Sequence, residues 1–187
     1  MMRLVLASQS PRRAELLRAA GFPFTVRPSD IDESPRAGED AAAYIQRLAW
    51  EKAQAAERSP DELVLAADTV VLIDGEVLGK PRNQADAERM LTALSGRKHA
   101  VLTAVCLRRG SKTAQETAET HVWFAQLTAD EIRDYAHGGE PMDKAGAYAI
   151  QGVASRWIER IDGSYSNVVG LPVAVVHRLL QHAKLSW

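Results

Sequence analysis

The sequence contains a single cysteine, Cys106, and no hydrophobic run that approaches the roughly 20 residues needed to cross a bilayer. One cysteine excludes an internal disulfide and a cysteine-rich metal site. The formal net charge is −1, so no global basic field indicates nucleic acid or an anionic membrane as a partner. The first residues lack the apolar region and cleavage site of a signal peptide. These absences predict a cytosolic globular protein in which Cys106 is a buried, inert thiol.

Several common functional signatures are also missing. The chain has neither a Walker P-loop nor a G-x-G-x-x-G fingerprint. Two of its five histidines, His177 and His182, lie five positions apart on one expected helix and therefore do not share a face as metal ligands would. No serine has a recognisable Ser-His-Asp context. Zinc chemistry and a nucleophilic serine are therefore not expected.

Strand and helix patterns alternate along all 187 residues, which predicts a mixed α/β protein with a single domain over residues 1–187. The apolar and turn patterns predict strands at residues 4–7, 22–27, 63–73, 76–78, 99–107, 117–127 and 153–161. They predict helices at residues 11–20, 39–58, 85–94, 129–136 and 173–183. The pattern does not specify the order of the strands.

Two arginines occupy an unusual place near the N-terminus. Ser10 is a good N-cap and Pro11 suits the first position of the helix that follows. Arg12 and Arg13 then fall in its first turn, at the positive end of the helix dipole, where cations are disfavoured. A bound anion would reverse this penalty, because backbone N–H groups and two guanidiniums would converge on it. Two interpretations stay open: a phosphate site, or arginines that point into solvent.

Asp68 interrupts the most apolar strand, in a context that predicts burial. A buried carboxylate needs a cation, a metal or a network of donors, whereas an Asp at a strand end or bulge reaches water. Thr69 points to the other face if the strand is regular. Glu33, in an acidic loop, is a candidate to ligate Mg²⁺ together with Asp68, since this ion favours carboxylates and substrate phosphates. The alternatives are a structural ion pair for Asp68 and an exposed charge for Glu33.

Two lysines and a glutamine complete the candidates. Lys52 lies on the long helix at residues 39–58 and Lys80 lies in a Gly-Lys-Pro turn. Single lysines are usually solvated, so either residue alone has a simple surface interpretation. Gln151 ends a polar and then small-residue loop at residues 143–152, and its amide offers a donor and an acceptor suited to the edge of a pyrimidine base. A plain connection is the alternative for this loop.

Taken together, these segments resemble the Maf family of nucleoside triphosphate pyrophosphatases. The matching segments cover essentially the whole chain, in the order ASQSPRR (7–13), DE (32–33), LAWEKA (48–53), ADT (67–69), GKP (79–81), LSG (94–96), DKAGAY (143–148), IQG (150–152) and GLP (170–172). The resemblance implies an inosine-triphosphatase-like α/β fold, with a mixed twisted sheet flanked by helices and a cleft between two lobes.

The chain is similar to the dTTP/UTP branch of this family, because PRR, ADT and AYxIQG patterns are present. The resemblance implies hydrolysis of dTTP or UTP to the monophosphate and pyrophosphate, with a divalent cation, Mg²⁺ or Mn²⁺, as cofactor. We hypothesise that Asp68 is the general base and shares the cation with Glu33. The implied phosphate-binding residues are Ser8, Ser10, Arg13, Lys52 and Lys80. The resemblance implies that the base is selected by Arg12, Thr69 and Gln151.

The expected partner is a small-molecule nucleoside triphosphate, with no nucleic acid and no membrane. Relatives in this family are often homodimers, although no apolar patch in this sequence identifies an interface. Two other functions stay open. One is hydrolysis of 7-methyl-GTP or another modified nucleotide. The other is a nucleotide-binding regulator of cell division without significant turnover, which would need no base at Asp68.

Overall fold

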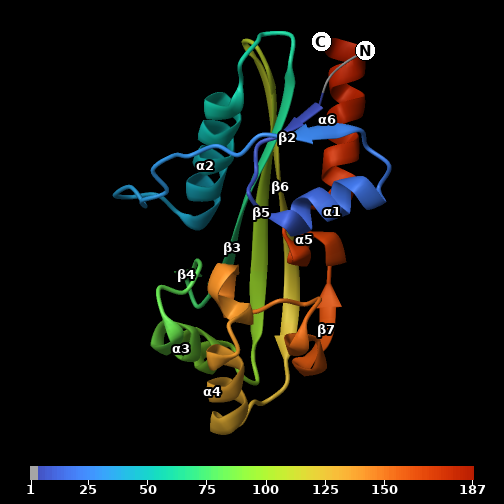
Figure 1. Cartoon of the computed structure of the whole chain (residues 1–187). Helices are drawn as coiled ribbons and strands as arrows, with labels where there is room; N and C mark the ends of the chain where they lie inside the picture. Colours follow the sequence, from blue (N-terminus) through green and yellow to red (C-terminus); the bar gives the residue numbers. More distant parts are fainter. Residues whose placement is uncertain (1–3) are drawn as a thin grey trace. The chain divides into compact units, whose positions relative to one another are not determined.

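The computed structural model describes residues 4–187, which form a mixed α/β fold with a seven-stranded sheet (Figure 1). The strand order is β2-β1-β3-β5-β6-β7, and β4 pairs with β3. The strands are β1 (Leu4–Leu6), β2 (Phe24–Val26), β3 (Leu63–Ile73), β4 (Glu76–Leu78), β5 (Lys98–Arg109), β6 (Lys112–Phe124) and β7 (Ile158–Asp162). The α-helices are α1 (Pro11–Ala19), α2 (Ala41–Ala56), α3 (Gln84–Leu94), α4 (Ala129–His137), α5 (Tyr165–Val169) and α6 (Val173–Ser186).

The chain forms two compact units. Unit 1 contains the described residues up to Asp68, together with Thr103–Ala118 and Gly170–Trp187. Unit 2 contains Thr69–Leu102 and Glu119–Val169. Strands β3, β5 and β6 contribute residues to both units, and β3 passes from one to the other between Asp68 and Thr69.

Unit 1 is built on parallel strands joined by helical crossovers. Strand β1 pairs in parallel with β2 and with β3, and Leu6 lies opposite Leu65. Parallel neighbours need a long crossover, which α1 and α2 supply. Helices α1 and α6 lie on one side of these strands and α2 on the other (Figure 1). All three residues of β1 are buried, because helices cover both faces of the strand. Burial on both faces explains why the strand is apolar at successive positions.

The parallel register also sets where the polar residues of unit 1 emerge. The backbone N–H of Ala7 donates to the carbonyl of Leu65 at 2.8 Å, so pairing continues one residue beyond β1. Ser8 follows Ala7, and Asp68 follows the same stretch of β3. Because β1 and β3 pair in parallel register, Ser8 and Asp68 lie close to one another just beyond the end of β1, although β3 itself continues to Ile73.

Unit 2 packs α3 and α4 against the remaining parts of the strands. Its core joins Leu91 of α3, Tyr135 of α4, Phe124 of β6 and the indole of Trp157. Strands β3 and β4 form an antiparallel hairpin, and β6 pairs antiparallel with β7. A tight turn at residues 74–75, in which both residues have positive φ, closes the first hairpin as the Asp-Gly signal predicts.

Three short 3₁₀ helices follow α4 in unit 2. They are η1 (Glu140–Asp143), η2 (Ala145–Ala147) and η3 (Val153–Trp157). The strand expected at residues 153–161 is therefore wrong in its first half, and β7 begins only at Ile158. Ala154 and Trp157 are both buried, and their spacing of three residues matches one helical turn rather than the alternation of a strand.

Other boundaries differ for similar reasons. Strand β6 begins at Lys112, five residues earlier than predicted, because Ala114 and Ala118 pack on the core of unit 1 while the residues between them are polar. Helix α5 was not predicted. The capping box of Thr128 and Glu131 at the start of α4 is confirmed.

Cys106 is fully buried, as the sequence predicts. Burial raises the pKa of its thiol to about 12, which keeps it protonated and unreactive. Among the helices of residues 4–187, none is long and apolar enough to span a membrane.

His99 generates a pH prediction for the fold. Its ring is 2% exposed and shares a hydrogen bond of 2.9 Å with the hydroxyl of Tyr148. Burial lowers its pKa from 6.5 to about 4. Between these values the unfolded chain binds a proton that the folded chain does not, so stability falls as the pH falls through this window. The full loss is roughly 3 kcal/mol, since one pKa unit corresponds to about 1.4 kcal/mol.

Urea unfolding of the wild type and His99→Gln between pH 7 and pH 4 measures this effect. The wild type should lose more stability on acidification than the variant. His137→Gln removes an exposed histidine of the same unit and serves as the control. Parallel stability curves for the wild type and His99→Gln would contradict the assignment.

Candidate active site

The N-terminus of α1 confirms the predicted placement of the two arginines. Ser10 is the N-cap, Pro11 is the first helical residue, and Arg12 and Arg13 follow in the first turn. The side chain of Ser10 makes no capping hydrogen bond, but its backbone N–H donates to the Oγ of buried Ser8 at 3.1 Å. Ser8 and Ser10 are therefore joined in one tight turn ahead of the helix.

Arg13 does not point into solvent. Its Nε donates to the carbonyl of Gly170 and its Nη1 to the carbonyl of Ala67, each at 2.7 Å. The same Nη1 reaches Ser8 Oγ at 3.4 Å. Burial lowers the pKa of Arg13, and the negative charge of Asp68 opposes that shift. The guanidinium thus anchors α1 to the residue before Asp68 and places a positive charge near that carboxylate.

Asp68 is buried and paired with a cation. It is 8% exposed, and its Oδ1 accepts a hydrogen bond of 2.5 Å from the Nζ of Lys52. Lys52, at 9% exposure, also contacts the Oε1 of Glu33 at 2.8 Å. One ammonium group is therefore shared by two carboxylates, one buried and one half exposed. A charge-assisted pair of this kind meets the need for a cation that the position of Asp68 predicts.

Helix α2 places Lys52 where an apolar residue is expected. Its buried face carries Ile45, Leu48, Ala49, Ala53 and Ala56, and Lys52 lies on this same face. Residues 48, 52 and 56 follow one another at intervals of four, which aligns them along the helix. The surface interpretation of Lys52 is therefore wrong, because a lysine on the buried face of a helix needs a partner such as Asp68.

Two α2 side chains that sequence analysis missed hold the acidic loop in place. The hydroxyl of Tyr44 donates to the backbone carbonyl of Glu33 at 2.7 Å. Arg47 binds the carboxylate of Glu39 and the carbonyl of Ser34. The hydrogen bonds from Arg47 lower the pKa of Glu39 to about 2. The available signal was Tyr44, an aromatic hydroxyl one turn before Leu48 on the helix that carries Lys52.

In unit 2 the structure joins two of the predicted segments. The backbone N–H of Gly146 donates to the carbonyl of Gly79 at 3.0 Å, which ties the loop of Lys80 to the segment at residues 143–152. Gly146 has φ +69°, and a Cβ there would lie 2.7 Å from a methyl carbon of Val71. A glycine is therefore required for this close approach. Lys80 itself is exposed.

Gln151 lies in a tight turn. The N–H of Gly152 donates to the carbonyl of Ala149 at 3.1 Å, so residues 149–152 form a turn with Gln151 at its third position. Its side chain is exposed, whereas the preceding Ile150 is buried. Thr69, the first residue of unit 2, is partly buried.

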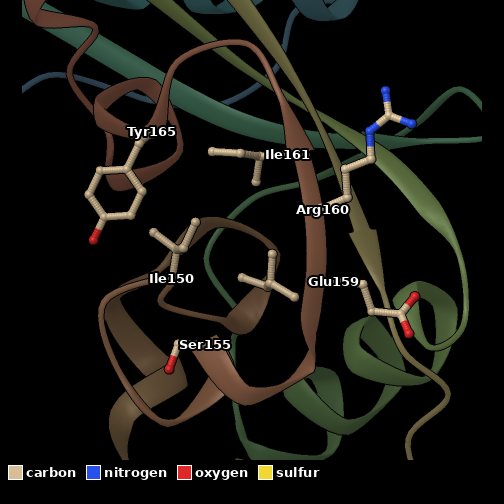
Figure 2. A pocket seen from close by; sticks show the side chains of 7 residues that line it. Ile150, Ser155, Glu159, Arg160, Ile161 and Tyr165 are labelled. Carbon is tan, nitrogen blue, oxygen red and sulfur yellow. The ribbon is translucent and has the colours of Figure 1, made fainter.

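A separate hollow of about 340 Å³ lies beside β7 (Figure 2). Ile150, Ile161 and Tyr165 lie on one side of the strand, and the side chains of Glu159 and Arg160 point to the other. Arg160 lies over the ring of Trp123 at 4.6 Å. None of the predicted site residues lines this hollow.

The predicted residues thus fall into two groups. Unit 1 brings together Ser8, Ser10, Arg12, Arg13, Glu33, Lys52 and Asp68. Unit 2 carries Thr69, Lys80 and Gln151. Two carboxylates, a shared ammonium and a helix N-terminus with arginines form a site suited to binding phosphate and moving a proton.

The fold defines a mixed α/β protein, and solved structures of Ham1 proteins share this fold. A Ham1 protein from Coxiella burnetii aligns with a TM-score of 0.57 at 18% identity, covering 97% of this chain and all of that one. The Ham1 protein of Staphylococcus aureus has the same TM-score at 14% identity, covering 97% and 99%. These likenesses confirm the expected inosine-triphosphatase-like fold.

The chain belongs to the Maf family. The family model described as Maf-like protein matches residues 3–183. Curated relatives with the name dTTP/UTP pyrophosphatase include that of Koribacter versatilis, 52% identical and covering 97% of this chain and 95% of the relative. The relative from an Anaeromyxobacter species is 56% identical, with 97% and 89% covered. That from Pseudoalteromonas atlantica is 50% identical, with 98% of both covered.

The shared ammonium yields a stability prediction. Lys52→Met leaves Asp68 buried without its cation and should destabilise the fold by about 3–5 kcal/mol. Adding Asp68→Asn removes the unpaired buried charge and should recover much of the lost stability. Urea unfolding of the single and double variants at pH 7 measures the coupling.

Lys184→Met changes an exposed lysine of the same unit and should shift stability by no more than about 0.5 kcal/mol. A double variant no more stable than Lys52→Met would show that Asp68 does not depend on Lys52.

Proposed function

We propose that this chain hydrolyses dTTP and UTP to the nucleoside monophosphate and pyrophosphate, in the cytoplasm. The observation that carries the proposal is the buried Asp68–Lys52 pair, next to an arginine-bearing helix N-terminus. Relatives that carry the name dTTP/UTP pyrophosphatase match over nearly the full length of the chain and support the choice of substrate. The bond broken is the anhydride between the α- and β-phosphates.

Asp68 is proposed as the general base. Lys52 binds its Oδ1, so we assign proton transfer to Oδ2, which takes a proton from the attacking water. A new P–O bond forms as the anhydride bond breaks and pyrophosphate leaves. Burial of Asp68 supports this role, because carboxylates in such surroundings cluster at active sites.

The phosphates are proposed to be bound by positive groups and by the start of α1. Arg13 and Lys52 carry fixed charge beside Asp68, and Lys80 is exposed in its turn. Ser8, Ser10 and the start of α1 are proposed to add hydrogen-bond donors. Developing negative charge on the leaving pyrophosphate is thereby stabilised.

A divalent cation, Mg²⁺ or Mn²⁺, fits the donors of unit 1. Glu33 and Asp68 already converge on one cation, the ammonium of Lys52. Mg²⁺ is commonly bound by one or two carboxylates together with substrate phosphates. Glu33 and Asp68 would hold the ion, which neutralises phosphate charge when bound.

Arg12, Thr69 and Gln151 are proposed to select the base. Support comes from the resemblance and from the exposed amide of Gln151, which offers both a donor and an acceptor to a pyrimidine edge. The homodimer expected from the resemblance stays a prediction.

Pyrophosphate release across a nucleotide panel, with Mg²⁺ or Mn²⁺, tests the proposal. Preferred turnover of dTTP and UTP is expected. Preference for 7-methyl-GTP or another modified nucleotide would replace the substrate assignment. Binding without turnover would favour a regulator.

Asp68→Asn tests the base. The amide keeps the shape of the side chain but cannot accept the proton, so kcat should fall by about 10²- to 10⁴-fold while nucleotide binding persists. Kinetics and equilibrium binding of UTP measure both quantities. Asp61→Asn changes an exposed carboxylate of unit 1 and should leave turnover unchanged. Turnover of Asp68→Asn close to wild type would disprove the assignment.

Thr69→Gln and Gln151→Glu test base selection, because the resemblance implies that the 7-methyl-GTP branch of the family has glutamine and glutamate at these two positions. The kcat/KM for dTTP and UTP should fall by about tenfold or more, since one mismatched polar contact in a recognition site costs at least this much. The same panel of nucleotides is the measurement. An equal loss on every nucleotide would argue against a role in reading the base.

A further inference from the structure

The turn that carries Gln151 is held at both ends by side chains from outside it. The N–H of Ala149 donates to the hydroxyl oxygen of Tyr135 at 3.1 Å. The N–H of Val153 reaches Oε2 of Glu140 in a longer hydrogen bond of 3.4 Å. The three residues between these anchors include Gln151, whose own side chain is exposed. Its position is therefore set through the backbone.

The two anchors are themselves connected. The hydroxyl of Tyr135 donates to Oε1 of Glu140 at 2.8 Å, so each carboxylate oxygen has a separate partner. Burial raises the pKa of Tyr135, and the hydrogen bond to Glu140 raises it further. The hydroxyl thus stays protonated: its hydrogen serves Glu140 and its lone pair accepts from Ala149. The donor and acceptor of each hydrogen bond among Ala149, Tyr135 and Glu140 therefore follow from the groups themselves.

Gly152 supplies independent support. Its φ of −107° is available to any residue, so backbone conformation does not require a glycine there. A Cβ at this position would lie 2.1 Å from Oε1 of Glu140. The Glu140 carboxylate therefore packs directly against the turn, and a side chain at residue 152 would displace it.

The Tyr135 anchor packs against buried residues of unit 2. Tyr135 is 5% exposed, and its ring packs edge-on against Trp157, with centroids 5.1 Å apart. The indole Nε1 of Trp157 donates in turn to Glu131, the capping-box residue of α4. Both buried rings restrict the positions available to the Tyr135 hydroxyl.

We propose that Tyr135 and Glu140 are positioning residues for base recognition, which fix the turn at residues 149–152 so that the Gln151 amide meets the pyrimidine edge. This inference rests on the proposed function of Gln151 in reading the base. The feature to be recognised is the edge of the pyrimidine at positions 3 and 4. Uracil has a donor at position 3 and an acceptor at position 4, and cytosine has the reverse.

Tyr135→Phe removes only the hydroxyl that links the turn to Glu140. The ratio of kcat/KM for UTP to that for CTP should fall about tenfold, chiefly through a higher KM for UTP. Tyr148→Phe is the matched control, because Tyr148 is also buried in unit 2 but its hydroxyl bonds His99. The control should keep the ratio within about twofold of wild type. A general structural role would lower turnover of both nucleotides and leave the ratio unchanged.

Two further variants keep the test decisive if Tyr135→Phe does not fold. Gly152→Ala should displace the Glu140 carboxylate and lower the same ratio. The carboxylate of Glu140 accepts from both the Tyr135 hydroxyl and the Val153 N–H. The amide of Glu140→Gln has only one acceptor oxygen, so this variant should also lower the UTP-to-CTP ratio. Unchanged ratios in these variants would overturn the inference.

Gln151→Ala separates this inference from the proposed function. If Gln151→Ala leaves the UTP-to-CTP ratio unchanged, the base-reading role itself is wrong. If it lowers the ratio and Tyr135→Phe does not, only the positioning role is overturned. In the Gln151→Ala background, Tyr135→Phe should produce no further change in the ratio, because it acts through Gln151.

Discussion

The candidate site of unit 1 depends on two ion pairs, in which the Lys52 ammonium is shared by Asp68 and Glu33. A carboxylate in the middle of a buried strand, as Asp68 is in β3, is costly unless a cation accompanies it. Helix α2 supplies that cation from its buried face, and Tyr44 and Arg47 on the same helix hold the loop of Glu33. One helix therefore supplies the counter-charge of both carboxylates and also holds the loop that carries Glu33.

Arg13 solves a related problem at the start of α1. A cation in the first turn is disfavoured by the helix dipole, and burial adds a further cost that lowers its pKa. Two backbone carbonyls and the charge of Asp68 offset these effects. Because one of those carbonyls belongs to Ala67, the arginine also ties α1 to the residue that precedes the proposed base. Its structural and electrostatic roles are inseparable.

The candidate residues of unit 2 differ from those of unit 1, because Lys80 and Gln151 are exposed. Their positions are set by hydrogen bonds of the backbone around them. Gly146 lets two loops approach closely enough for a hydrogen bond. Tyr135 and Glu140 hold the turn around Gln151 by accepting hydrogen bonds from Ala149 and Val153. An exposed side chain on a well-anchored turn can contact a ligand without first losing packing of its own.

Local sequence determined the helix start at Pro11, the Asp-Gly turn, the capping box of α4 and the burial of Cys106, because each depends on neighbouring residues or on apolar pattern. It also identified Asp68 as a carboxylate in need of a partner. Only the tertiary structure decided that this partner is Lys52, and that Arg13 is held by Ala67 and Gly170. These pairs are 16 to 157 residues apart in sequence, and contacts over such separations are set by strand register and helix packing, which no local pattern encodes.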